Sequence, residues 1–260
     1  MTGAAAEDVP VPAWATLVRA DNPGPMTLEG TNTWVLRGGA GQAAVVVDPG
    51  PLDEAHLDAV AAAAGPVALV LLTHGHPDHA EGARSFVERV GSPLAAADPR
   101  HTAGADPLRD GVHLDLAGLD LRVLATPGHT SDSVTFLVRG GGRAGLLTGD
   151  TVLGRGTTVV AHPDGRLGPY LRSLRVLRDL DGPLALLPGH GPAGGEATAR
   201  AAAYLEHRAA RLDQVRAALA AGDTTPAEVV ARVYADVDHV LWPAAELSVR
   251  AQVEYLRDEG

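Results

Sequence analysis

Three histidines and one aspartate occur within six residues, His74–His79, in the sequence HGHPDH. The apolar run Val67–Leu72 before them predicts a buried strand, so the cluster falls where that strand ends. In a loop, imidazoles two positions apart can face one point, and Asp78 with His79 can turn toward a second point beside it. Imidazole and carboxylate groups are ligands of divalent metal ions. The spacing therefore predicts a metal site at this strand end.

Four further segments place a side chain of metal-binding type at the end of an apolar run. These side chains are Asp48, His129, Asp150 and His190. Side chains delivered from one edge of a sheet core can converge, so we expect all five strand ends to share one rim. A glycine precedes His129, Asp150 and His190, and this lets the backbone approach the site closely.

Four motifs resemble those of the metallo-β-lactamase superfamily. They are HGHPDH at 74–79, PGHT at 127–130, TGD at 148–150 and PGHG at 188–191. The resemblance covers roughly residues 15–215 and implies an α/β fold, an αββα sandwich, with a dinuclear and usually zinc centre. Nitrogen and oxygen ligands without thiolate leave manganese and iron open as alternatives.

The resemblance also implies a role for each candidate residue. One metal ion would be held by His74, His76 and His129, the other by Asp78, His79 and His190, with Asp150 bridging them. Asp48 matches an aspartate that supports the ligands from behind, although it could also be a plain turn residue. A hydroxide that bridges the two ions would attack the substrate, and Asp78 would also act catalytically by orienting it.

Three other side chains are candidates for substrate contacts. Asn32 and Thr33 could reach the site or could only satisfy a hairpin. His207 lies in a predicted helix, where a packing role is the alternative to contact with the substrate or leaving group. The segment 22–34 and the pattern Tyr204–Arg208 with Arg211 resemble the beta-lactamase-like protein two group. Its members are hydrolases, the animal one a single-strand endoribonuclease, and they carry a small winged-helix-like C-terminal piece.

The chain divides into two predicted parts. Residues 1–215 form the metallo-β-lactamase hydrolase domain, in which alternating strand-like and helix-like segments predict a β-rich core with helices outside. Residues 216–260 form a small helical, winged-helix-like C-terminal domain. The arginines of the helix predicted over 196–220 indicate a solvated face with acidic partners such as Glu206, or else a phosphate-binding strip. They are Arg200, Arg208, Arg211 and Arg216.

Composition excludes several kinds of chemistry. There is no cysteine, and all 21 basic residues are arginine. Disulfides, thiolate ligands, Schiff bases and P-loop chemistry are therefore absent. The net charge of −11 disfavours polyanionic partners. The opening segment 1–12 lacks the features of a signal peptide and no apolar run approaches the length of a membrane span, so we expect a cytoplasmic protein without membrane contact.

These observations predict a metal-dependent hydrolase that acts on a small acyl substrate such as a thioester or ester. Asp150 matches the bridging acid of the thioesterase and phosphodiesterase branches, whereas common class B lactamases place a cysteine at a metal position. A metal-dependent endoribonuclease for single-stranded RNA is the alternative, favoured by the group resemblance and the arginine-bearing helix. A non-catalytic binding module that uses the C-terminal helices is a third possibility, opposed by the complete ligand set.

Overall fold

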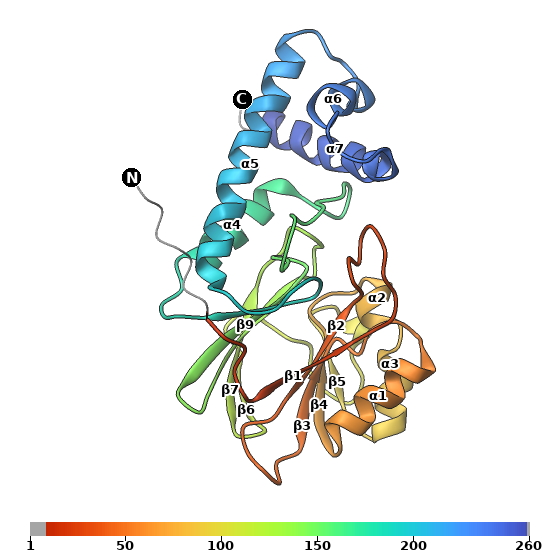
Figure 1. Ribbon diagram of the computed structural model, residues 1–260, viewed down its shortest axis with the longest axis vertical. Coiled ribbons are helices and arrows are strands. Elements are labelled where there is room, and N and C mark those ends of the chain that lie inside the picture. Colours follow the sequence, from red (N-terminus) through yellow and green to blue (C-terminus); the bar gives the residue numbers. More distant parts are fainter. Residues whose placement is uncertain (1–8, 259–260) are drawn as a thin grey trace.

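The computed structural model of the chain describes residues 9–258. Part of the segment on which the predicted absence of a signal peptide depends, residues 1–8, lies outside the described residues. Two five-stranded sheets face each other with helices on both outer sides, and a helical appendage extends from one end (Figure 1). The predicted αββα sandwich with a small helical appendage is therefore confirmed. No helix within residues 9–258 is long and apolar enough to cross a membrane.

The first sheet has the order β1-β2-β3-β4-β5. Its strands are β1 (Ala15–Arg19), β2 (Asn32–Leu36), β3 (Ala44–Val47), β4 (Val67–Leu71) and β5 (Leu94–Ala95). The first three are antiparallel, and β3, β4 and β5 are parallel. Helices cover the outer face, namely α1 (Glu54–Ala64), the short α2 (Pro77–Ala80) and α3 (Ala83–Val90). Because β3 and β4 are buried on both faces, they read as continuous apolar runs.

The second sheet has the order β10-β9-β8-β7-β6. Its strands are β6 (His113–Leu116), β7 (Leu119–Ala125), β8 (Val134–Gly140), β9 (Arg143–Gly149) and β10 (Ala185–Pro188). Strand β10 is parallel to β9, and the other neighbours are antiparallel. Helix α4 (Leu167–Arg178) and the long α5 (Ala197–Ala220) cover its outer face, where Tyr170, Leu174 and Tyr204 pack on Leu146 and Leu186.

The main core lies between the two sheets. It contains Trp34 and Leu71 from the first sheet and Leu121, Phe136 and Leu147 from the second, all of them nearly or fully buried. Strand β7 alternates buried and exposed positions along Leu119–Val123, the pattern of a strand with one face on the core. Burial of this apolar surface holds the sheets together and fixes their shared edge.

The C-terminal appendage has its own small core. Helices α6 (Pro226–Val233) and α7 (Trp242–Asp258) pack on the last turns of α5, with Val215, Val229, Val230 and Val249 buried between them. Two short 3-10 turns, Pro99–His101 and His239–Leu241, complete the described elements. The predicted boundary between residues 215 and 216 falls inside α5, so the division of the chain at that point stays a prediction.

The ends of the parallel strands bring the candidate residues to one edge of the sandwich. Asp48 follows β3 directly, His74 follows β4 after Leu72 and Thr73, and Asp150 follows β9 directly. Strand β10 ends at Pro188, and Gly189 and His190 follow it. Asn32 of β2 donates its backbone N–H to the Gly189 carbonyl over 2.8 Å, which ties the first sheet to the end of the second.

Candidate metal centre

All seven predicted ligands meet at this edge, in groups that could each hold a metal ion. Each group has its ligand atoms within 4.8 Å of one another. The three-histidine group is His74, His76 and His129, and the Asp78 group is Asp78, His79 and His190. A third combination, His74, His79 and Asp150, lies between them. The ligand sets predicted from the sequence therefore correspond to clusters in the structure.

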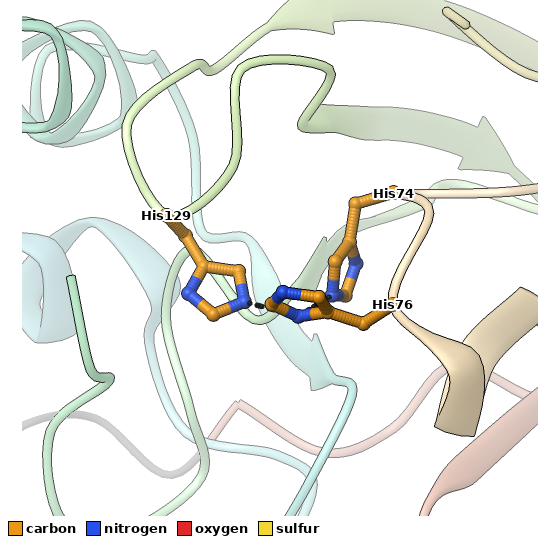
Figure 2. A group of neighbouring side chains, drawn as sticks. All are labelled: His74, His76 and His129. Atoms are coloured by element: carbon orange, nitrogen blue, oxygen red, sulfur yellow. Dashed lines mark hydrogen bonds between the residues drawn. The ribbon is translucent and has the colours of Figure 1, made fainter. Parts of the chain in front are cut away.

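The three-histidine group joins two loops that are far apart in sequence. Figure 2 shows His129 reaching across from its own loop toward His76 and His74, which leave the loop after β4. His74 Nε2 lies 3.0 Å and His129 Nε2 lies 3.1 Å from His76 Nδ1. Two nitrogens bound to one tetrahedral ion at 2.0–2.1 Å would lie about 3.3 Å apart. The spacing therefore fits ligands that share one ion.

The Asp78 group is equally compact. His190 Nε2 lies 3.2 Å from His79 Nε2 and 3.0 Å from Asp78 Oδ2. His79 Nε2 lies 3.3 Å from the same carboxylate oxygen. Asp78 is the most accessible of the three, because its side chain is 27% exposed, whereas those of His79 and His190 are almost fully buried.

Asp150 lies between the two groups. Its Oδ1 is 3.4 Å from His79 Nε2, and its Oδ2 is 3.4 Å from His190 Nε2 and 3.7 Å from His129 Nε2. Within residues 9–258, Asp150 Oδ1 is buried without a hydrogen-bond partner. A buried carboxylate oxygen without a hydrogen bond is costly, and a bound cation would compensate for that cost. The donor set therefore fits divalent metal ions.

Asp48 contacts His79 at Nδ1, the ring nitrogen that does not face the other candidate ligands. It is 2% exposed, and Oδ1 accepts a hydrogen bond from the Thr73 backbone N–H over 2.7 Å. Its Oδ2 accepts from Thr73 Oγ1 over 2.7 Å and from His79 Nδ1 over 2.9 Å. Such a partner fixes the tautomer and orientation of an imidazole ligand. Asp48 also has a positive φ of 52°, which aspartate tolerates better than most residues.

Backbone and hydroxyl oxygens orient the other imidazoles. His129 Nδ1 donates to the Val159 carbonyl over 2.8 Å, and His190 Nδ1 donates to the Gly30 carbonyl over 3.2 Å. His74 Nδ1 lies 3.0 Å from Thr73 Oγ1, whose proton goes to Asp48. His74, His79, His129 and His190 therefore turn Nε2 into the centre, whereas His76 presents Nδ1.

The electrostatics of the two groups differ. Burial, together with the neighbouring imidazoles, holds the pKa of His74 well below its usual 6.5, and burial lowers the pKa of His129. Burial alone would also lower the pKa of His190, but the carboxylates of Asp150 and Asp78 raise it to about 9. His74 and His129 therefore offer neutral nitrogens at neutral pH, and the Asp78 group holds a proton when no metal is bound.

Glycine is required where the backbone passes closest to the ligands. An added Cβ at Gly189 would lie 2.6 Å from Asp150 Oδ1 and 2.7 Å from His79 Cε1. At Gly149 it would lie 2.4 Å from Thr73 Oγ1, and the φ of this glycine is +47°. Both clashes are shorter than real Cβ contacts, which explains the glycine before His190 and before Asp150.

The predicted substrate contacts occupy different surroundings. Asn32 is buried and donates its side-chain amide to the carbonyls of Pro188 and Gly191, over 3.1 and 2.9 Å. Thr33 is also buried and donates its hydroxyl to the Asp48 carbonyl over 2.6 Å. Both side chains therefore hold the loops that carry His190 and Asp48. Their substrate role stays a prediction.

The remaining candidate for a substrate contact, His207, lies on α5 together with the arginines near it. His207 is half-buried, and burial followed by Arg208 and Arg211 lowers its pKa. The prediction of a solvated arginine face is wrong for Arg208, which is 6% exposed and donates to the Thr158 carbonyl. A carbonyl acceptor carries no side-chain signal, so the sequence did not reveal this contact.

Comparisons with known proteins agree with this geometry. Residues 26–190 match the family model of the metallo-beta-lactamase superfamily, and residues 225–260 match that of a beta-lactamase associated winged helix domain. A beta-lactamase-like protein 2 homolog from Drosophila melanogaster is 33% identical, over 92% of this chain and 86% of its own length. An atrochrysone carboxyl ACP thioesterase from Aspergillus fumigatus is 35% identical, over 67% of this chain and 55% of its own length.

Solved structures share the fold. A metallo-beta-lactamase family protein from Thermus thermophilus superposes with a TM-score of 0.79 at 26% identity, over 95% of this chain and 94% of that one. The crystal structure of TTHA1623 in a di-iron-bound form gives a TM-score of 0.54 at 27% identity, over 72% of this chain and 95% of that one. The chain belongs to the metallo-β-lactamase superfamily and is a metal-dependent hydrolase.

Proposed function

We propose that this hydrolase uses two divalent metal ions to cleave a small acyl substrate, a carboxylic thioester or ester. The observation that carries the two-ion proposal is the position of Asp150, with one oxygen near His79 and the other near His129 and His190. A carboxylate between two ligand groups suits a bridging role. The di-iron form of a structural relative supports the same reading.

Under this proposal, His74, His76 and His129 hold one ion and the Asp78 group holds the other, with Asp150 shared. Zinc is the ion that we propose, since imidazole and carboxylate ligands with nitrogens about 3 Å apart suit it. The chemistry supplied by a bound pair is a water of lowered pKa and polarisation of the scissile carbonyl oxygen.

The protein's own contribution is orientation and charge. Burial would raise the pKa of Asp78, but His79 and His190 lower it strongly, so its carboxylate is ionised at neutral pH. Thr31 Oγ1 donates to Asp78 Oδ2 over 3.3 Å and limits its rotation. The partly exposed Asp78 is thus placed to accept a hydrogen bond from the attacking water and to fix its direction.

Charge favours an acyl substrate over a nucleic acid. The chain has a net charge of −11, and segment 216–260 contains twice as many acidic as basic side chains. Such a field repels a phosphate backbone, whose binding normally depends on arginine and lysine contacts. The resemblance to a named thioesterase supports the same substrate class.

Cleavage of single-stranded RNA is the second candidate, because residues 225–260 match a winged helix domain model. Within 216–258, however, the structure describes helices and no strand that could form a wing. Arg208, the most buried arginine of α5, contacts a backbone carbonyl and the Tyr170 ring rather than facing solvent.

One paired assay tests the proposal. The zinc-loaded protein and an Asp78→Ala, His79→Ala double variant are given a panel of acyl thioesters and esters and, separately, an end-labelled single-stranded RNA. We expect thioester hydrolysis that the double variant loses. RNA cleavage that disappears in the double variant, without thioester turnover, would make the ribonuclease function primary. Equal RNA cleavage by both proteins would indicate a contaminating nuclease.

A further inference from the structure

The 151–160 loop, which is part of the connection between β9 and α4, contacts three of the candidate ligands. It starts directly after Asp150, and the Val159 carbonyl accepts the hydrogen bond from His129 Nδ1 over 2.8 Å. The Gly154 backbone N–H donates to the His190 carbonyl over 3.0 Å. The position of this loop therefore decides how His129 faces the centre.

Side chains on one face of α5 hydrogen-bond to the backbone of the 151–160 loop. Arg200 donates Nε to the Leu153 carbonyl over 3.3 Å and Nη2 to the Gly156 carbonyl over 3.1 Å. Tyr204 Oη accepts a hydrogen bond from the Leu153 N–H over 3.0 Å. Residues four apart lie on the same face of a helix, so Arg200, Tyr204 and Arg208 form a row along the loop.

Arg208 makes the contact nearest to His129. It donates Nη2 to the Thr158 carbonyl, one residue before the Val159 carbonyl that His129 uses. Its guanidinium carbon lies 5.2 Å from the centroid of the Tyr170 ring, and Tyr170 Oη donates to the Thr151 carbonyl over 2.7 Å. The loop is thus held at both ends.

The burial of Arg208 is costly, which argues that its hydrogen bond is needed. The side chain is 6% exposed, and its Nε has no hydrogen-bond partner within residues 9–258. A buried guanidinium beside a carbonyl and an aromatic ring loses hydration that an apolar side chain of similar length would not lose. Packing alone would therefore favour methionine or leucine, and what arginine adds is a directed donor to the Thr158 carbonyl.

We propose that Arg208 and Tyr204 are positioning residues for the metal centre, acting through the 151–160 loop on His129. The path runs from the Arg208 guanidinium to the Thr158 carbonyl, through one peptide unit to the Val159 carbonyl, and then to His129 Nδ1. The inference rests on the proposed function to the extent that His129 is a metal ligand. It gives the Tyr204–Arg208 pattern a role that does not involve the substrate.

Arg211 provides a matched control on the same helix. It donates to the Val233 carbonyl at the end of α6, and its guanidinium carbon lies 4.2 Å from the centroid of the Tyr234 ring. Its contacts have the same chemistry as those of Arg208, but they hold the C-terminal appendage instead of the 151–160 loop. Removing Arg211 tests the loss of a stacked arginine without a change at His129.

The experiment compares Arg208→Met, Arg211→Met and Tyr204→Phe with the wild-type protein. Affinity for zinc is measured by competition with a chromophoric chelator, and the visible absorption of the cobalt-substituted proteins reports ligand geometry. Loss of a group that orients an imidazole ligand costs about 10- to 100-fold in metal affinity. We expect a loss of this size at one ion in Arg208→Met, with an altered cobalt spectrum, and a smaller loss in Tyr204→Phe. Arg211→Met should keep wild-type affinity and spectrum.

Two results would overturn the inference. One is a folded Arg208→Met protein with wild-type zinc affinity and cobalt spectrum, and the other is an equal loss in Arg211→Met. If Arg208→Met fails to fold, Tyr204→Phe decides, because it removes one hydroxyl and keeps the ring. A wild-type protein that binds a single ion would refute the two-ion proposal, whereas the variants would still decide the role of Arg208 at that ion.

Discussion

The three-histidine group and the Asp78 group are held in different ways, although they lie side by side. The Asp78 group is built on buried charge, since Asp48 accepts from His79, and Asp78 and Asp150 lie within 3.4 Å of His79 or His190. In the three-histidine group, His129 lies 3.7 Å from Asp150 Oδ2, and its Nδ1 donates to the backbone carbonyl of Val159 instead of to a carboxylate. One group is therefore sensitive to charge and pH, and the other to the position of a loop.

The largest effect should follow the loss of the residue that both groups share. Asp150→Ala removes the carboxylate between them, so we expect both ions to bind more weakly and hydrolysis to fall by more than about 100-fold, beyond the cost of losing a residue behind a ligand. Asp78→Ala should weaken only the ion of its own group. Metal stoichiometry and turnover measured on both variants test this difference, and equal metal loss in the two would contradict it.

Asp48→Asn should weaken metal binding more at the Asp78 group than at the three-histidine group, because Asp48 contacts His79 directly. The amide keeps the shape of the side chain but can no longer accept from all three donors that now reach it, the Thr73 N–H, the Thr73 hydroxyl and His79 Nδ1. We expect about a 10- to 100-fold loss of metal affinity, larger at the Asp78 group. Thr33→Val is a matched control, because the hydroxyl that it removes hydrogen-bonds to the Asp48 backbone carbonyl and to His56, and leaves the hydrogen bonds of the Asp48 carboxylate in place. If Thr33→Val lost the same metal affinity, the loss in Asp48→Asn would be due to general packing and not to the hydrogen bonds of the carboxylate.

The pH dependence of metal binding should differ between the groups. The pKa of His190 is about 9 in the metal-free protein, so a proton must leave before Nε2 can bind an ion. Burial alone would lower the pKa of His79, but the carboxylates of Asp150, Asp48 and Asp78 raise it. Affinity at the Asp78 group should therefore rise with pH up to about pH 9 and beyond, up to about tenfold per unit for each released proton. The three-histidine group, with lowered pKa values at His74 and His129, should bind without this dependence at pH 7 and above.

Calorimetric titrations with zinc in buffers of different ionisation enthalpy, from pH 6.5 to 9.5, count the released protons at each group. Proton release of equal size at both groups would remove the distinction.

The same shift in the pKa of His190 predicts an effect of pH on the stability of the metal-free protein. Because the pKa of His190 is raised from 6.5 to about 9, its stabilising contribution is complete below pH 6.5 and is lost as the pH rises through 9.

The smallest effect is expected at the appendage. Thr225 caps α6 in a capping box with Glu228, so Thr225→Ala should lower the free energy of unfolding by about 1 kcal/mol. Both metal groups should keep their affinity, since the cap lies outside the contacts of the 151–160 loop. Thermal unfolding together with a zinc titration checks this expectation, and weaker zinc binding would show that the appendage reaches the centre.

Local sequence was sufficient for most of the elements and for the choice of the candidate metal ligands. The apolar runs before Asp48, His74, Asp150 and His190 predicted strands that end close to these residues, and the structure has strands there. Apolar periodicity and glycine positions act over a few residues, so they are readable without the fold. The short helix α2 was missed, because four residues that begin with a proline carry no periodic pattern.

The long-range contacts were decided by the tertiary structure. The strand ends predicted a shared rim, but apart from the family resemblance nothing in the sequence indicates which side chains group there, such as His129 with His74 and His76, or that Asp150 lies between two groups. The burial of Arg208 also contradicted the pattern of a solvated helix face. Its acceptor is a backbone carbonyl 50 residues away, and a carbonyl is the same at every position of the chain. The residue types and strand ends were therefore set by the sequence itself, whereas the support of each ligand depends on how loops fold back on α5 and on the two sheets.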